Sequence, residues 1–264
     1  MRRLLMYGSA VLLLTSPSWG ATLDASYFFQ NTLNAQQSGA PALTAIDPTG
    51  TSGFVSDPTL GRTVYNFSGS TTPTDQGGLS VNTSTILPTN NSYSVEMYFQ
   101  FFDRNSAYRR ILDAQQRQAD SGLYVDPSNR LQVYPESDGG NTFTNNAYHD
   151  VTLTDNSGTV KAYLDGNLSL TITTTDTDIT GNTLNFFLDN LIGGGIGEYS
   201  TGDIAALRLY DGVLTDAQVA ALAADPLAGS GNSMSGVPEP ATWLLMGVGL
   251  LVAAGVRRKN TSRD

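Results

Sequence analysis

Apolar and polar residues alternate with a period of two in several short segments of this chain. Between residues 94 and 101, Val95, Met97, Phe99 and Phe101 are separated by single polar or tyrosine residues. Successive side chains of a strand point to opposite faces of a sheet, so this pattern predicts a half-buried strand. The same alternation recurs at 151–153, 160–164, 168–172, 184–188 and 205–209. These segments predict an all-β protein, an antiparallel β-sandwich.

Turn-forming residues separate three of these segments in a way that predicts two hairpins. Asp155-Asn156-Ser157-Gly158 follows the strand at 151–153, and Asp165-Gly166-Asn167 follows the strand at 160–164. We expect Gly166 and Asn167 to take positive φ angles, since both residue types tolerate them.

One short helix is expected near the end of the β region. Thr215 is followed three residues later by Gln218, which is the spacing of a capping box. Val219, Leu222 and Ala223 form a modest apolar stripe, and Asp225-Pro226 is expected to end the helix.

Composition excludes several kinds of site. The chain has no cysteine, so it has no disulfide, no thiolate nucleophile and no cysteine-bound zinc. Residues 21–240 hold eight Lys and Arg against 23 Asp and Glu, a net charge of −15. Nucleic acid and anionic lipid are therefore poor partners for this surface.

The C-terminus has three consecutive features. Val237-Pro238-Glu239-Pro240 is expected to be extended, because each proline restricts itself and its predecessor. Residues 241–256 carry no charge and would reach about 24 Å as a helix, a marginal membrane span. Arg257, Arg258 and Lys259 follow and can extend their charges to the membrane interface. The alternative is that Pro240 opens an ordinary buried helix.

The N-terminus predicts a secretory signal peptide. Arg2 and Arg3 precede an apolar segment, and Ser18-Trp19-Gly20 supplies a cleavage site after Gly20. Basic residues at both ends place both termini in the cytoplasm during insertion and everything between them outside. We expect a signal peptide at 1–20, one domain at 21–226, a flexible linker at 227–236, and a tail at 237–264 with a transmembrane helix at about 241–256.

The tail resembles the PEP-CTERM sorting signal of Gram-negative bacteria. Pro238, Glu239 and Pro240, then the apolar segment, then the arginine cluster occur in the order of that family. The resemblance implies that an exosortase, a membrane peptidase, recognises the motif and removes the tail. It also implies an inner-membrane intermediate, delivery to the cell surface or extracellular matrix, and a host that makes exopolysaccharide.

The β region resembles the laminin G-like, concanavalin A-like jelly-roll family. Tyr148-His149-Asp150-Val151 before a turn, Tyr163-Leu164-Asp165-Gly166 after it, and Arg208-Leu209-Tyr210 ahead of the short helix are similar to motifs of its members. Tyr148 stands where the family often has tryptophan. The resemblance implies a jelly-roll sandwich with one C-terminal helix and does not specify a ligand.

We expect no catalytic residues. Related hydrolases place paired carboxylates on one strand as Glu-x-Asp-x-x-Glu, whereas Glu96 has Tyr98 and Phe101 at those spacings. Asp176 and Asp178 are expected in a turn or edge strand, and His149, the only histidine, is expected to be structural. A glycoside hydrolase with carboxylates from scattered loops stays open as the alternative.

Cofactors are not expected, with calcium as the one open question. Asp189, Asn190, Glu198 and Asp203 flank a glycine-rich loop, and their oxygens could converge on calcium. The alternative is that they are solvated acids of a soluble acidic protein.

The expected function is non-catalytic binding of a glycan or of the extracellular polysaccharide matrix. Sugar rings stack on tyrosine faces, and Tyr98, Tyr124 and Tyr134 are candidate platforms. The alternative, expected for most of them, is that they are ordinary strand residues, since tyrosine is favoured in strands. A purely structural or adhesive surface protein is the other open alternative.

Overall fold

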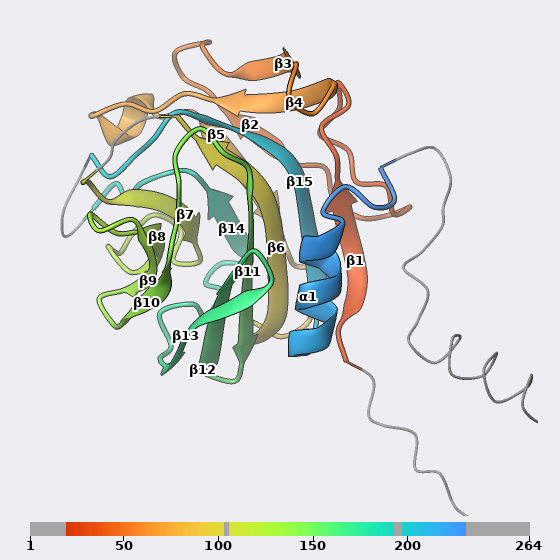
Figure 1. Cartoon of the computed structure of the whole chain (residues 1–264), viewed down its shortest axis with the longest axis vertical. Coiled ribbons are helices and arrows are strands. Elements are labelled where there is room, and N and C mark those ends of the chain that lie inside the picture. Colours follow the sequence, from red (N-terminus) through yellow and green to blue (C-terminus); the bar gives the residue numbers. More distant parts are fainter. Residues whose placement is uncertain (1–19, 103–105, 193–196, 231–264) are drawn as a thin grey trace, which may run out of the picture.

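The structure, a computed structural model, describes residues 20–102, 106–192 and 197–230. Fifteen strands form two antiparallel sheets in these ranges, which we name sheet A and sheet B (Figure 1). The described part of the chain also holds a short 3₁₀ helix, Pro73–Asp75, and one α-helix, α1, Asp216–Ala224. This arrangement confirms the predicted antiparallel sandwich with one short helix.

Sheet A runs β13-β12-β11-β6-β15-β4-β3, and β1 pairs with the other end of β15. Its strands are β1 (Thr22–Tyr27), β3 (Gly53–Asp57), β4 (Arg62–Phe67), β6 (Ser92–Phe101), β11 (His149–Asn156), β12 (Thr159–Leu164), β13 (Asn167–Thr173) and β15 (Gly202–Asp211).

Sheet B runs β10-β9-β8-β7-β14-β5-β2. Its strands are β2 (Thr44–Ile46), β5 (Gly78–Asn82), β7 (Arg109–Asp113), β8 (Gly122–Val125), β9 (Arg130–Tyr134), β10 (Asp138–Thr142) and β14 (Thr183–Phe186). The long connections between strands that pair within a sheet give the sandwich its jelly-roll character.

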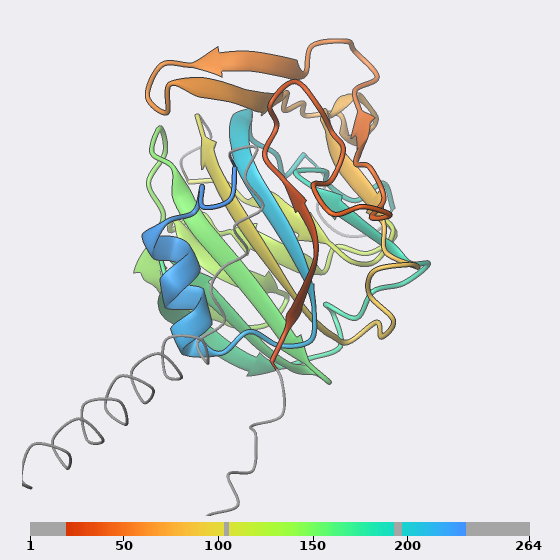
Figure 2. The same ribbon diagram turned by 90° about the vertical axis from the view of Figure 1, so that its right-hand side faces the viewer.

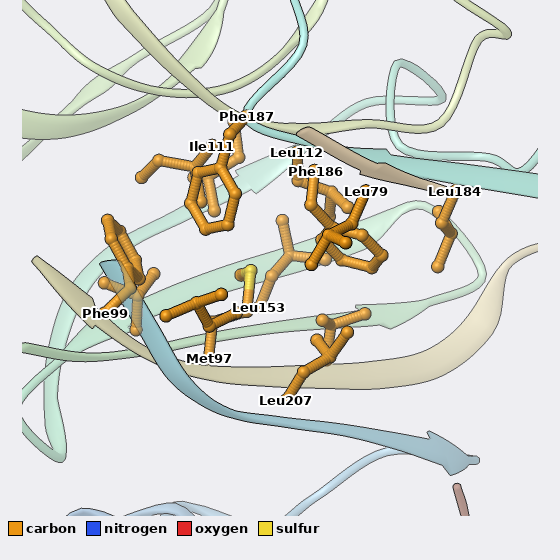
Figure 3. Packing of buried hydrophobic residues seen from close by; sticks show 14 of the residues in the cluster. Leu79, Met97, Phe99, Ile111, Leu112, Leu153, Leu184, Phe186, Phe187 and Leu207 are labelled. Atoms are coloured by element: carbon orange, nitrogen blue, oxygen red, sulfur yellow. The ribbon is translucent and has the colours of Figure 1, made fainter. Parts of the chain in front are cut away.

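The core lies between the two sheets, as Figure 3 shows. Met97, Phe99, Leu153 and Leu207 of sheet A face residues of sheet B that include Ile111 and Phe186 (Figure 3). The alternating positions of β6 that the sequence indicated, from Val95 to Phe101, are all fully buried.

A left-handed backbone conformation at Phe187 places two consecutive aromatic rings in this core. Phe187, directly after β14, takes a φ of 62°. Its ring therefore joins that of Phe186 inside the sandwich and stacks on Phe67 with 3.8 Å between ring centroids. The predicted strand at 184–188 stops at Phe186 for this reason, although Leu188 is buried as expected.

The two predicted hairpins are present, with one correction. Asp165 (φ 52°) and Gly166 (φ 75°) take the positive φ angles at the second turn, whereas Asn167 already belongs to β13. The prediction for Asn167 was wrong because the turn begins one residue earlier. A register shift between Ala162 and Tyr163 also leaves Leu168 47% exposed, outside the core pattern.

Helix α1 packs on the outer face of sheet A (Figure 2). Thr215 and Gln218 form the predicted capping box, and Asp225 caps the C-terminal end. Val219 and Leu222 bury against Tyr163, Tyr210 and Leu214 in a small second cluster. No helix among the described ranges is long and apolar enough to cross a membrane.

Candidate binding site on the outer face of sheet B

The outer face of sheet B carries a cluster of tyrosines. Along β8 and β9, Leu123, Val125, Leu131 and Val133 point into the core, so the residues between them point outward. Tyr124 lies opposite Arg110 of β7 on one side and Gln132 of β9 on the other.

Tyr108, Tyr124 and Tyr134 contact one another edge to face. Their ring centroids are 5.9, 5.9 and 6.1 Å apart, at interplanar angles of 71 to 81°. Such T-shaped pairs are favourable arrangements for aromatic rings. Tyr124 is fully buried beneath the other two, which are half-buried. We call Tyr108, Tyr124 and Tyr134 the tyrosine cluster.

Arg110 supports the tyrosine cluster from below. Its side chain is fully buried, its Cζ lies 5.1 Å from the Tyr124 ring centroid, and it pairs with Asp113 at 3.0 Å. It also donates to the side chain of Asn190 at 3.1 Å and to the carbonyl of Ser121. Gly122 is needed beside it, because a Cβ there would lie 2.6 Å from the Leu112 carbonyl oxygen and 3.0 Å from an Arg110 nitrogen.

Asp189 shapes the loop that borders the cluster. Its carboxylate accepts the backbone N–H groups of Asn190, Gly197 and Glu198, at 2.9, 2.7 and 3.0 Å. It also lies 3.8 Å from Arg110. Burial nevertheless raises the pKa of Asp189, partly offset by these hydrogen bonds and by Arg110.

Two carboxyl groups lie beside the Tyr124 hydroxyl. Tyr124 donates to the Asp120 carbonyl at 3.0 Å, with the Asp120 carboxylate at 3.5 Å. Burial, followed by the negative charges of Asp120 and Asp189, raises the pKa of Glu198 to about 7, and a hydrogen bond with Tyr124 opposes the rise. Glu198 is therefore a carboxyl group that gains and loses its proton near neutral pH.

The tyrosine cluster and its carboxyl rim were only partly foreseen. Tyr134 is half-exposed as a platform should be, but the prediction for Tyr124 was wrong, because its ring is fully covered. Tyr98 lies on sheet A, where its ring centroid is 5.1 Å from that of Tyr148, and it is not part of the cluster. The sequence analysis did not predict Arg110 or Tyr108 as site residues. The adjacent pair Arg109-Arg110 could have indicated this site, because arginine is rare in the rest of the domain.

The four calcium candidates divide between two places. Asp189, Asn190 and Glu198 share one loop network, whereas Asp203 binds Asn66 at 2.9 Å and Gln100 at 3.3 Å on sheet A. Within the described ranges, no group of three or more His, Cys, Asp or Glu residues has the geometry to hold a metal. The calcium site stays a prediction, which calcium titration of thermal unfolding tests.

Glu96 and Asp176, the other acidic residues considered, each interact with a neighbouring side chain of the domain. Glu96 is fully buried and pairs with Arg208 of β15 at 2.6 Å. Asp176 lies in a turn, where it accepts the Thr174 hydroxyl at 2.7 Å.

The His149 side chain forms hydrogen bonds with Thr144, before β11, and with Asp165, in the turn between β12 and β13. Its Nε2 accepts the N–H of Thr144 at 3.0 Å, so Nδ1 carries the proton and donates to Asp165 at 2.8 Å. The Thr144 hydroxyl lies 3.1 Å from Nε2, which resembles a nucleophile–base pair. Because the lone pair of Nε2 already accepts an N–H, this geometry supports a structural role.

Family comparison agrees with this architecture. Residues 73–220 match the model of the concanavalin A-like lectin/glucanases superfamily, in its laminin G form, and the chain belongs to that family. Residues 236–259 match the PEP-CTERM protein-sorting motif, which marks the chain for export. Pro238, Glu239, Pro240, Arg257, Arg258 and Lys259 fall in this match and lie outside the described residues. No curated protein matches the chain significantly.

Solved structures share the fold at low identity. Domain 4 of the extracellular arabinanase AbnA from Geobacillus stearothermophilus, solved with arabinotriose, is 20% identical, with a TM-score of 0.57. The match covers 78% of this chain and all of that domain. The binding domain of botulinum neurotoxin serotype D/C is 18% identical, with a TM-score of 0.54, and covers 76% of this chain. The match spans about half the length of that neurotoxin domain.

Proposed function

We propose that this chain is an exported surface or matrix protein that binds glycan, without cleaving it, through the outer face of sheet B. The observation that carries the proposal is the tyrosine cluster with Asp120 and Glu198 at its rim. The C–H face of a sugar ring packs on Tyr108 and Tyr134, while its hydroxyl groups donate to the carboxylates.

Two similarities support a carbohydrate ligand. The arabinanase domain of the same fold was solved with arabinotriose. A botulinum neurotoxin binding domain of the same fold was solved with SialylT. Both are distant in sequence, so they support the class of ligand and not its identity.

The sorting signal supplies the cellular context for this proposal. An exosortase cuts the tail while the chain is held in the inner membrane of a Gram-negative bacterium, and the domain passes to the surface or the polysaccharide matrix. The boundaries 1–20, 21–226, 227–236 and 237–264 belong to this proposal. The intact mass of the mature protein from its host tests both cuts.

Binding to the host exopolysaccharide and to an array of defined oligosaccharides tests the ligand class. Tyr134→Ala and Tyr108→Ala should each weaken binding at least tenfold, whereas Tyr98→Ala, which removes a half-buried tyrosine of sheet A, should change it less than twofold. Equal losses for all three variants would contradict the proposed face. A flat response of the wild type would favour a structural or adhesive protein.

A second candidate function is glycoside hydrolysis, and Glu198 is the observation that favours it. A carboxyl group with a pKa of about 7 suits a general acid, and Asp120 is a second carboxyl group nearby. Release of reducing ends from the bound glycan, abolished by Glu198→Gln while binding persists, would establish it. No release from any glycan that binds would leave the non-catalytic proposal.

A further inference from the structure

The segment after α1 is folded onto the domain and does not simply leave it. The N–H of Asp225 donates to Leu222, that of Ala228 to Asp225, and that of Ser230 to Leu227, at 3.1, 3.0 and 3.1 Å. These three bonds form a run of tight turns. They continue from the helix to the last described residue.

Arg208 holds this run of turns against sheet A. One of its terminal nitrogens donates to the backbone carbonyls of Pro226 and Ala228, each at 2.8 Å. The other donates to both carboxylate oxygens of Glu96, at 2.8 and 2.6 Å. The guanidinium also lies 5.0 Å from the ring centroid of Phe28. We call these contacts the Arg208 clamp.

The clamp is buried and its charge is paired. Arg208 is 3% exposed, and Glu96 is fully buried. A planar guanidinium can donate hydrogen bonds to a carboxylate and to two carbonyls at the same time. A lysine ammonium cannot do so with the same geometry. The arginine therefore joins the sheet, the turns and the beginning of the linker.

We propose that the Arg208 clamp fixes the point at which the sorting tail leaves the folded domain, and thereby limits how far the domain can lie from the membrane during processing. This inference rests on the proposed sorting function. It makes Arg208 a positioning residue for tail processing, since it acts through the segment it holds.

Chain geometry gives the size of the effect. From Ser230 to Pro238 an extended chain spans at most about 28 Å. Opening the clamp would free residues 225–230 and add about 20 Å. The clamp therefore keeps the tether short, and opening it would increase the reach of the tether from about 28 Å to about 48 Å.

Hydrogen exchange on the full-length chain in detergent tests the clamp itself. In the wild type, the amides of Ala228 and Ser230 should exchange at least tenfold more slowly than unprotected amides. Arg208→Lys should remove this protection while the amides of β6 remain protected, and Arg130→Lys, on sheet B, should leave it intact. Unprotected Ala228 and Ser230 in the wild type would overturn the proposal, whatever the variants do.

Processing in the host tests the consequence. Deletion of residues 231–235 shortens the tether by about 17 Å and should reduce tail cleavage at least fivefold. Arg208→Lys should restore cleavage of the shortened chain, because opening the clamp returns the lost reach, and Arg130→Lys should not. Retained protection of the β6 amides in Arg208→Lys would show that the restored cleavage comes from the opened clamp and not from unfolding of the domain.

The outcomes separate this proposal from the sorting function. Normal cleavage of the shortened chain, or failure of Arg208→Lys to restore it, would overturn the positioning role. If the chain with its natural linker is not cut at all, the sorting proposal fails. Hydrogen exchange then decides the clamp alone.

Discussion

Arg208 of β15 donates from one nitrogen to both carboxylate oxygens of Glu96 on β6, at 2.8 and 2.6 Å. Next to this pair, burial and the charge of Glu96 raise the pKa of Asp150 well above its usual range. The raised pKa favours the protonated form of Asp150 beside the Glu96–Arg208 pair. Glu96, the carboxylate at the centre of β6, is thus held inside sheet A by this ion pair.

Breaking this ion pair should be costly. Glu96→Ala leaves a buried guanidinium without its carboxylate and should reduce the free energy of unfolding by about 3–5 kcal/mol. Urea unfolding, followed by far-UV circular dichroism, measures this loss of unfolding free energy. The double variant Glu96→Gln with Arg208→Met should be more stable than Glu96→Ala, and Lys161→Met, at an exposed pair, should leave the midpoint unchanged. A loss below 1 kcal/mol for Glu96→Ala would contradict the assigned burial.

Glu198 should make stability depend on pH. Its pKa is about 7 in the folded protein against 4.5 as the reference for the unfolded chain, so the folded state binds the proton more tightly. Its contribution is fully present below pH 4.5 and is lost as the pH rises through 7. Glu198→Gln should therefore be more stable than wild type at pH 8, by about 1 kcal/mol after solvent screening, and equal to it at pH 4.

Thermal unfolding at both pH values measures this difference. Glu136→Gln, at an exposed position, is the matched control and should behave as wild type at each pH. A Glu198→Gln advantage that is the same at pH 4 and pH 8 would refute the raised pKa.

Two adjacent glycines of β10 should respond differently to alanine. A Cβ on Gly139 would lie 2.1 Å from the Ser169 hydroxyl oxygen and 3.1 Å from the Ser169 carbonyl oxygen of β13, where an edge of sheet B meets an edge of sheet A. Gly139→Ala should destabilise the domain by about 1–3 kcal/mol through overpacking. Gly140→Ala, with no atom within 4 Å of its Cβ, should be neutral. Equal unfolding midpoints for the two variants would contradict this contact.

The sorting motif should be required for release. Pro238→Ala with Glu239→Ala removes the rigid strip that the peptidase is proposed to recognise. The full-length chain should then accumulate in the inner membrane, as immunoblots of membrane and culture fractions would show. Release at the wild-type rate would count against exosortase processing of this chain.

Local features of this protein were determined by the sequence alone. The alternation from Val95 to Phe101 predicted β6, because the period of two is a property of any strand with one face in a core. Thr215 and Gln218 predicted the start of α1, because a capping box involves only residues three positions apart. The tail motif was equally local.

The candidate site required the tertiary structure. Tyr124, Arg110 and Asp189 come from β8, β7 and the loop after β14, and only strand pairing brings them together. The burial of Tyr124 and the raised pKa of Glu198 depend on neighbours far apart in the chain. No local pattern encodes such contacts, because sheet register and loop packing are decided by the whole domain. The sequence thus determined the strands, the helix and the sorting signal, whereas the packing of the sandwich decided which polar groups face one another.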